Sequence, residues 1–251
     1  MDYKKLAKDI SDWIKKQVEE ANAKGVVFGL SGGVDPAVVS VLCKNAFPKE
    51  HLALILPCFS SKKDSDDAEL VVEKFGLNSK VINLEEAFLS FCKTLDFEPQ
   101  SKELAVANIK PRLRMVTLYY FANKLNYLVV GTGNKSELTM GYFTKYGDGG
   151  VDILPLGDLT KTEVYRLAKV LNIPQRIIEK TPSAGLWPGQ TDEEEMGIKY
   201  KLLDEIIYSI EGDRSLEKFD KKIIEKVLKK KKQSSHKLNP PKMFKINGQK
   251  K

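Results

Sequence analysis

The sequence has no long apolar run and few of the residues from which cysteine or histidine metal sites are built. No stretch approaches the roughly 20 apolar residues of a membrane helix, and the N-terminus leads into an amphipathic pattern without an apolar signal segment. The three cysteines, Cys43, Cys58 and Cys92, are scattered without metal-ligand spacing, and the chain has only two histidines. These absences favour a cytoplasmic protein with reduced thiols and no membrane contact.

Excess positive charge is also scarce outside the C-terminal segment. The net charge is +7, but residues 218–251 hold 13 lysines and two acidic residues, so that segment carries +11 and the remainder −4. A nucleic-acid-binding protein more often interleaves basic and aromatic residues near its site. We therefore expect no nucleic-acid partner, and we expect a solvated Lys-rich helix and tail over about residues 214–251.

Apolar patterning predicts strands that alternate with helices along the whole chain. The expected strands are 26–30, 51–56, 80–83 and 127–130. The expected helices are 3–21, 37–45, 64–75, 84–93, 101–124, 159–171, 193–210 and one that begins near 216, and Pro111 is a candidate interruption of the 101–124 helix. Short apolar strands between helices indicate a sheet buried on both faces. The predicted fold class is α/β, a doubly wound parallel sheet with helices on both faces. No repeat or linker divides the chain, so residues 1–251 are predicted to form a single domain.

Two of these strands end in glycine-bearing turns, at 31–35 and 131–134. In a parallel sheet such turns open onto the same edge, where ligands bind. Glycines let the backbone approach an anion, and the helix that follows offers free N–H groups and a positive dipole end. Asp35 adds a carboxylate where a magnesium ion on bound phosphates would sit. The pattern predicts a phosphate site.

Two familiar phosphate loops are excluded, because the chain lacks both the Gly-Lys-Ser/Thr ending of P-loop proteins and the G-x-G-x-x-G dinucleotide fingerprint. The run Ser-Gly-Gly-Val-Asp at 31–35 instead resembles the PP-loop of ATP pyrophosphatases. Longer segments follow it: NIKPRLRM at 108–115, GTGNKSE at 131–137, GYFTKYGDGGVD at 141–152, LPLGDLTK at 154–161 and PSAGLWPGQTDEEE at 182–195, then His236 and Lys237. In this order the set resembles the ammonia-dependent NAD synthetases, over nearly the whole chain.

That resemblance implies an adenine nucleotide alpha hydrolase-like fold, a cytoplasmic homodimer and a ligase that completes NAD biosynthesis. The implied reaction joins ammonia to nicotinic acid adenine dinucleotide (deamido-NAD) through an acyl-adenylate, with ATP as co-substrate, and gives NAD, AMP and pyrophosphate. Relatives that use glutamine carry an added glutaminase domain. The phosphate turn begins within the first 31 residues, so we expect no such domain here and free ammonia as the nitrogen donor.

The resemblance also implies roles for individual residues. Asp35 and Glu137 are expected to bind Mg²⁺, and both, with Lys161, are the predicted catalytic residues. The ATP-binding positions are Gly29, Leu30, Ser31, Gly32, Gly33, Val34, Asp35, Pro36, Thr132, Lys161 and Ser183. The deamido-NAD-binding positions are Arg112, Lys145, Asp152, His236 and Lys237.

Pro36 departs from the family pattern, which has a serine at this position. A serine would offer a hydroxyl and an N–H to phosphate, and proline offers neither. We therefore expect weaker ATP or pyrophosphate binding than in a Pro36→Ser variant. Two other functions stay open: a PP-loop enzyme that adenylates a tRNA base or another small carboxylate, and a nucleotide-binding sensor without catalysis. The charge distribution argues against the first, and the set Asp35, Glu137 and Lys161 against the second.

Overall fold

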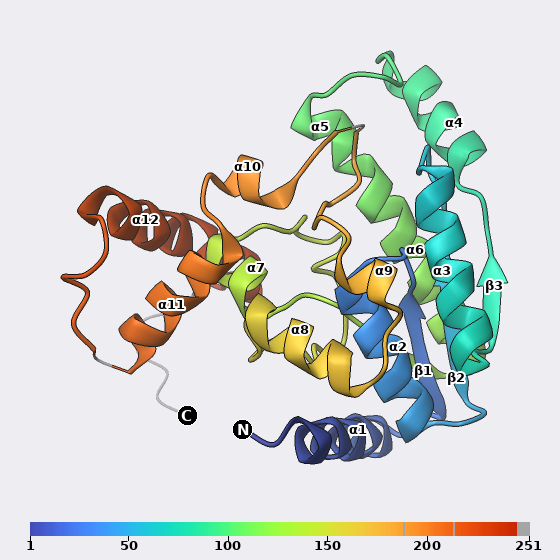
Figure 1. Cartoon of the computed structure of the whole chain (residues 1–251). Helices are drawn as coiled ribbons and strands as arrows, with labels where there is room; N and C mark the ends of the chain where they lie inside the picture. Colours follow the sequence, from blue (N-terminus) through green and yellow to red (C-terminus); the bar gives the residue numbers. More distant parts are fainter. Residues whose placement is uncertain (188, 213, 245–251) are drawn as a thin grey trace.

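A four-stranded parallel sheet forms the centre of the molecule in a computed structural model that describes residues 1–187, 189–212 and 214–244. The strands β1 (Gly25–Gly29), β2 (His51–Ile55), β3 (Ser79–Val81) and β4 (Tyr127–Val130) lie in the order β3-β2-β1-β4 (Figure 1). Val27 of β1 pairs with Leu52 of β2 on one side and with Val129 of β4 on the other. The chain moves outward from β1 to β3 and then returns to place β4 beside β1. The β1/β4 crevice is therefore the topological switch point, where ligands bind in such sheets.

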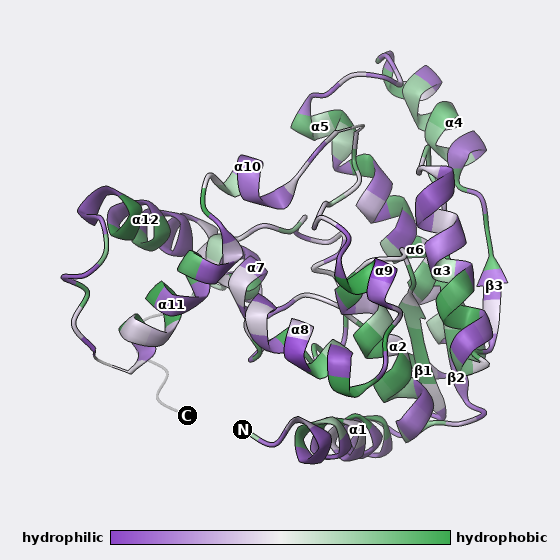
Figure 2. Cartoon of the chain, viewed as in Figure 1, coloured by the Kyte–Doolittle hydropathy of each residue, from purple (hydrophilic) through white to green (hydrophobic). Residues whose placement is uncertain are grey.

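Helices cover both faces of this sheet, as the alternation of apolar segments predicts. Val26 and Phe28 of β1 enter one buried cluster with side chains from α1 (Tyr3–Glu20), α2 (Val34–Ala46), α3 (Lys62–Phe75), α8 (Lys161–Val170) and α9 (Gln175–Ile178). Val27 points the other way, into a cluster with α4 (Glu85–Leu95), α5 (Leu104–Ala107) and α6 (Ile109–Leu125). Figure 2 shows β1 and the adjoining α2 as predominantly hydrophobic ribbon, in contrast to the two-sided colouring of α1. The predicted doubly wound α/β fold is confirmed.

The second half of the chain adds a smaller helical layer beside the sheet. Four helices, α7 (Lys135–Met140), α10 (Asp192–Met196), α11 (Tyr200–Glu211) and α12 (Lys221–Leu238), share a third buried cluster. The fit between α12 and α7 is close, because a Cβ added to Gly141 would lie 2.0 Å from Cβ of Ser234. Figure 1 shows α10, α11 and α12 on the side of the molecule opposite β3. This layer brings the Lys-rich helix next to the end of β4.

Several predicted boundaries are wrong for identifiable reasons. Helix α2 begins at Val34, three residues before the predicted start at 37. Pro36 is tolerated in the first turn, because the N–H that it lacks would have no intrahelical partner there. The predicted 101–124 helix breaks at Asn108 and not at Pro111, and Gly197, with φ +61°, divides the predicted 193–210 helix. The last helix spans 221–238 instead of starting near 216. The predicted tail extends to residue 251, and its part at 245–251 lies outside the described residues.

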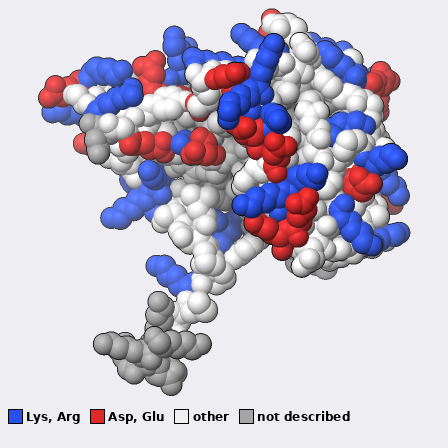
Figure 3. All heavy atoms as spheres, turned by 90° about the horizontal axis from the view of Figure 1, so that it is seen from below, with Lys and Arg blue, Asp and Glu red and all other residues white. Residues whose placement is uncertain are grey.

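None of the described helices is both long and apolar enough to cross a membrane. The three cysteines are buried and form no disulfide. On the face shown in Figure 3, acidic and basic side chains are interspersed over the surface.

Candidate active site

The first glycine turn lies at the carboxyl end of β1 and is packed tightly against α3. Gly32 has φ +76°, and a Cβ at this position would come within 2.4 Å of the Asp64 carbonyl oxygen. Only glycine satisfies both the backbone conformation and the space. Gly33 is the N-cap of α2 and has an extended conformation, and no side chain caps the first N–H groups of this helix at that position. The first N–H groups of α2 are therefore available to a bound anion.

The second turn leads into α7, a short helix that the sequence analysis did not predict. Asn134 caps it: its side chain accepts the N–H of Glu137 at 3.0 Å, and Glu137 accepts the N–H of Asn134 at 3.2 Å. The Asn-x-x-Glu spacing is the local signal that could have revealed this helix. Asn134 is fully buried, and its amide also donates to Asp35 Oδ1 at 2.9 Å. This residue therefore joins the two glycine turns.

Lys161, Asp35 and Glu137 meet where the two turns face each other. Lys161 is the first residue of α8 and is only 2% exposed. Its Nζ lies 2.5 Å from Asp35 Oδ2 and 3.3 Å from Glu137 Oε1. The structure thus brings all three predicted catalytic residues together. The Lys161 ammonium is expected to bind ATP. In this structure it contacts the two carboxylates that are expected to bind Mg²⁺.

Burial governs the ionisation of this cluster. Burial raises the pKa of Glu137 to about 8, against the opposing effect of the Lys161 ammonium and with the help of the Asp35 charge. Burial alone would lower the pKa of Lys161, but the Asp35 and Glu137 carboxylates outweigh it and raise that pKa above its ordinary value. The ammonium is therefore a fixed positive charge, and the Glu137 carboxyl is the member of the cluster that changes charge near neutral pH.

Two residues behind the cluster were missed by the sequence analysis. Tyr200, at the start of α11, places its ring 5.0 Å from Lys161 Nζ and donates its hydroxyl to Asp192 Oδ2 at 2.9 Å. Asp192 is 4% exposed, and its other carboxylate oxygen has no hydrogen-bond partner among the described residues. Burial raises the pKa of Asp192. The site therefore contains a third carboxylate, and no local pattern distinguishes it from the other acidic residues at 192–195.

The predicted substrate positions surround one large cavity beside this cluster. Its volume is about 930 Å³, and every predicted site residue except Gly32 and Asp152 lines it. Two of the predicted dinucleotide contacts are occupied within the chain: Lys145 Nζ donates to the His236 carbonyl at 2.6 Å, and Lys237 Nζ donates to the Gly141 and Phe143 carbonyls at 2.8 Å each. Arg112 approaches the Lys145 carbonyl at 3.5 Å. Seven cationic side chains line this space: Arg112, Arg114, Lys145, Lys161, Lys180, Lys230 and Lys237.

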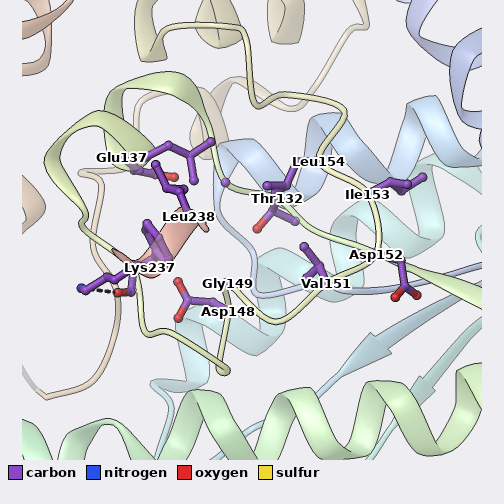
Figure 4. A pocket seen from close by; sticks show the side chains of 13 residues that line it. Thr132, Glu137, Asp148, Gly149, Val151, Asp152, Ile153, Leu154, Lys237 and Leu238 are labelled. Carbon is purple, nitrogen blue, oxygen red and sulfur yellow. Dashed lines mark hydrogen bonds between the residues drawn. The ribbon is translucent and has the colours of Figure 1, made fainter. Parts of the chain in front are cut away.

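Asp152 does not line the large cavity. It lines a smaller cavity of about 250 Å³, accepts the Tyr119 hydroxyl and the Val129 N–H, both at 2.8 Å, and lies across that cavity from Lys237 (Figure 4). Asp148, which lines both cavities, was missed; burial raises its pKa. Its only visible sequence signal is its place in the Gly-Asp-Gly-Gly run.

The acidic residues have a chemistry suited to a divalent cation shared with a ligand. Asp35 and Glu137 already hold one cationic group between them, the Lys161 ammonium. Within the described residues no group of three or more His, Cys, Asp or Glu side chains has the arrangement of a complete metal site. Magnesium commonly binds to one or two carboxylates and completes its shell with water and substrate phosphates. The residues therefore fit an ion that arrives with a nucleotide and do not fit an all-protein metal cage.

Comparison with known proteins gives concordant matches over nearly the whole chain. A family model described as NAD synthase matches residues 6–241. A protein of Carboxydothermus hydrogenoformans named NH(3)-dependent NAD(+) synthetase is 50% identical over 233 residues, which cover 92% of this chain and 96% of that protein.

Two solved structures share the fold from end to end. The NMN synthetase from Francisella tularensis has a TM-score of 0.88 at 35% identity, with 98% of this chain and 100% of that chain covered. The NH3-dependent NAD synthetase from Campylobacter jejuni, solved in complex with the nitrate ion, has a TM-score of 0.83 at 31% identity, with the same coverage.

Proposed function

The chain belongs to the NAD synthase family, and from this premise we propose that it amidates the carboxylate of nicotinic acid adenine dinucleotide with ammonia at the expense of ATP. The products are NAD, AMP and pyrophosphate. The observation that carries the proposal is the meeting of Asp35, Glu137 and Lys161 beside a glycine turn, at the wall of a cavity of about 930 Å³. A binding protein has no need of this buried, mutually dependent set of charges.

The chemistry requires an activated carboxylate, because oxide is too poor a leaving group for direct attack by ammonia. A carboxylate oxygen of the substrate attacks the α-phosphorus of ATP, and pyrophosphate departs. Ammonia then attacks the acyl carbon through a tetrahedral oxyanion, and AMP departs with the former carboxylate oxygen. The attacking nitrogen loses one proton to solvent or to a nearby carboxylate, because ammonia has three hydrogens and the amide has two.

The residues at the carboxyl ends of β1 and β4 divide this work. Ser31, Gly33 and the free N–H groups of α2 are placed to bind phosphate oxygens. The Lys161 ammonium stabilises the negative charge that develops on the departing pyrophosphate once a ligand draws it from the carboxylates. Arg112 and Lys145, which line the far part of the cavity, are suited to the pyrophosphate of a dinucleotide.

Asp35 and Glu137 are the residues that would hold Mg²⁺. When bound, the ion supplies positive charge to the phosphates and the leaving pyrophosphate. The support is the pair of carboxylates that share one cation, together with a raised pKa at Glu137 that a divalent charge would relieve.

A second candidate substrate is nicotinic acid mononucleotide, because one of the two reported structural neighbours is named an NMN synthetase. The names of the relatives that match end to end, NH(3)-dependent NAD(+) synthetase, favour the dinucleotide. A direct test supplies the protein with ATP, Mg²⁺, ammonia and either acid, and separates NAD from NMN chromatographically. We expect a much higher kcat/KM for the dinucleotide. A higher kcat/KM for the mononucleotide would contradict the proposed substrate.

The nitrogen donor is tested in the same assay by replacing ammonia with glutamine. We propose free ammonia as the donor, as it is in the names of the relatives that match end to end. Glutamine at equal concentration is expected to give no NAD above the level produced by contaminating ammonia. Efficient use of glutamine would contradict the proposal.

We also propose that the protein acts as a homodimer. Support comes from α5 and α6, where Leu104, Val116 and Tyr120 are each about 60% exposed to solvent in the single chain. Burying such exposed apolar surface in a subunit interface is energetically favourable. Light scattering on a sizing column checks the proposal: a mass near 28 kDa would contradict it, and twice the chain mass is expected. The cytoplasmic location stays a prediction.

A further inference from the structure

We propose that Lys180 is a positioning residue that holds the phosphate loop, residues Ser31–Asp35, at the correct distance from the second phosphate-binding segment, 181–183. This inference rests on the proposed function, because it takes these segments as the ATP site. Lys180 lies in the short stretch after α9 and lines the large cavity. No local sequence pattern assigns it a role, because its partners are 113 to 148 positions away.

The Lys180 ammonium has a different acceptor for each of its three donors. Its Nζ lies 2.6 Å from Asp64 Oδ1, 2.8 Å from Asp67 Oδ2 and 3.3 Å from the Gly32 carbonyl oxygen. A lysine ammonium has three N–H groups and no acceptor, so the full bonding capacity of the group is used in this arrangement. The side chain is 18% exposed, which leaves it little screened by water.

These three contacts join the phosphate loop to α3. Asp67 has a fully buried side chain, and its second oxygen lies 2.7 Å from Arg176 Nε of α9. Gly32 fits so closely onto the same helix that an added Cβ would meet Asp67 Cβ at 2.8 Å. A buried carboxylate requires pairing, and removal of one partner is costly. Asp67 therefore fixes Lys180, and Lys180 fixes the carbonyl of Gly32 in the loop.

The same lysine is continuous with the second phosphate-binding segment. Thr181, Pro182 and Ser183 follow it directly and line the same cavity as Ser31 and Gly33. The Lys180 side chain is therefore a direct link between the two segments, and its ammonium is held by two carboxylates and one backbone carbonyl. Pro36 makes this link more important, because the first turn of α2 offers phosphate one N–H fewer than it would with any other residue.

The test is the Lys180→Met variant, which keeps the aliphatic chain and removes the charge and the donors. Its matched control is Lys44→Met, because Lys44 Nζ also donates to backbone carbonyls, of Gly76 at 2.9 Å and Pro48 at 3.2 Å, but at the opposite end of the sheet. The dissociation constants of α,β-methylene-ATP and of deamido-NAD are measured by calorimetry for both variants, together with kcat and Tm.

We expect Lys180→Met to weaken binding of the ATP analogue by about 10- to 100-fold, the scale for loss of one hydrogen bond between the displaced loop and a charged phosphate. Binding of deamido-NAD should change less than about twofold, and Lys180→Arg should recover part of the loss of ATP affinity. Lys44→Met should lower Tm without changing the affinity for either nucleotide.

Two results would overturn the inference. One is unchanged ATP affinity in Lys180→Met, and the other is an equal loss of affinity for both nucleotides, which would indicate a general structural defect. If Lys180→Met does not fold, Asp64→Asn tests the same point, because it weakens the most exposed of the three contacts and should selectively reduce ATP affinity. A wild-type protein that binds ATP but forms no NAD would refute the proposed function, and the binding comparison would still decide the role of Lys180.

Discussion

The two ends of the central sheet both hold buried polar side chains, but they satisfy them in opposite ways. At the amino end, His51 is 2% exposed, its Nδ1 lies 2.7 Å from the Phe47 carbonyl oxygen, and its Nε2 accepts the Asn78 N–H at 3.0 Å. One neutral tautomer, with the proton on Nδ1, meets both requirements. No charge is buried there without need, so this end of the sheet serves stability.

The carboxyl end instead gathers carboxyl groups whose ionisation is opposed by burial. Asp35 and Glu137 contact the Lys161 ammonium, Asp192 lies behind them, and one oxygen of Asp192 has no hydrogen-bond partner among the described residues. Such an arrangement costs free energy, and the cation that we propose to enter with the substrate would relieve it. The difference indicates that stability resides at one end of the sheet and function at the other.

The largest effect is expected from replacing the two carboxylates that we propose to bind Mg²⁺. Asp35→Asn and Glu137→Gln should each lower kcat by at least about 100-fold, the usual scale for loss of one group that stabilises transition-state charge. Glu137→Gln should retain a stable fold, because Lys161 keeps its 2.5 Å contact with Asp35. Steady-state NAD formation and thermal unfolding measure both quantities; near-normal kcat in both variants would refute the metal assignment.

His51→Leu is the matching change at the amino end. It removes both ring hydrogen bonds and should lower the free energy of unfolding by about 1–3 kcal/mol, the cost of leaving partly buried polar groups unpaired. Because His51 lies at the opposite end of the strands from the cavity, kcat should change less than about twofold. Denaturant unfolding and the NAD assay, run well below the Tm, check this. A large loss of kcat with unchanged stability would contradict the claim that the amino end of the sheet serves stability and the carboxyl end serves function.

The two ends should also respond to pH with opposite signs. The folded protein retains a proton on Glu137 between the ordinary pKa of 4.5 and its folded value of about 8. The unfolded chain has released that proton, so stability falls as the pH rises through this window. Burial lowers the pKa of His51 below 6.5. The folded protein therefore resists protonation there, and stability falls as the pH drops below 6.5.

Tm measured against pH without nucleotide or Mg²⁺ separates these contributions. Glu137→Gln should gain stability relative to wild type as the pH rises from about 4.5 to 8, and His51→Leu should lose less stability than wild type below pH 6.5. At about 2–4 °C per kcal/mol for a chain of this size, both trends are measurable. Parallel curves for all three proteins would show that these two groups do not titrate differently on folding.

The smallest effect concerns Pro36. Pro36→Ser restores an N–H and adds a hydroxyl in the first turn of α2, so ATP affinity should rise by about 10-fold, the lower end of the range for one added hydrogen bond to a charged group. Stability should fall by no more than about 1 kcal/mol, because the unfolded chain gains conformational freedom. Calorimetric titration with α,β-methylene-ATP measures the difference. Equal affinity in the two proteins would show that the loop does not use this position.

Much of this architecture could be predicted from local pattern. The strands at 127–130 and near 26–30 end in glycine turns, and parallel pairing of β1 with β4 then brings Asp35 and Glu137 to one edge. The helix breaks were less accessible: Pro111 looked like an interruption, but in the first turn of α6 its missing N–H has no cost, and the chain breaks at Asn108.

Residues that act across the fold could not be predicted. Asp192 and Tyr200 reach the cluster only because α10 and α11 fold back over α7 and α8. Lys180 meets Asp67 across 113 positions, and neither residue belongs to a glycine turn. Asn134 was accessible in principle, through its Asn-x-x-Glu cap. Tertiary packing decides these contacts, and hydrophobic periodicity in a single sequence does not indicate which distant residues pack together.

The central claim, that the carboxyl end of the sheet activates a carboxylate as an acyl-adenylate, is tested most directly by isotope transfer. Deamido-NAD with both carboxylate oxygens labelled as ¹⁸O is converted with ATP, Mg²⁺ and ammonia, and the nucleotides are analysed by mass spectrometry. The account predicts one ¹⁸O atom in AMP for each NAD formed and one retained in the amide. Label in inorganic phosphate with ADP as co-product, or label-free AMP, would contradict it.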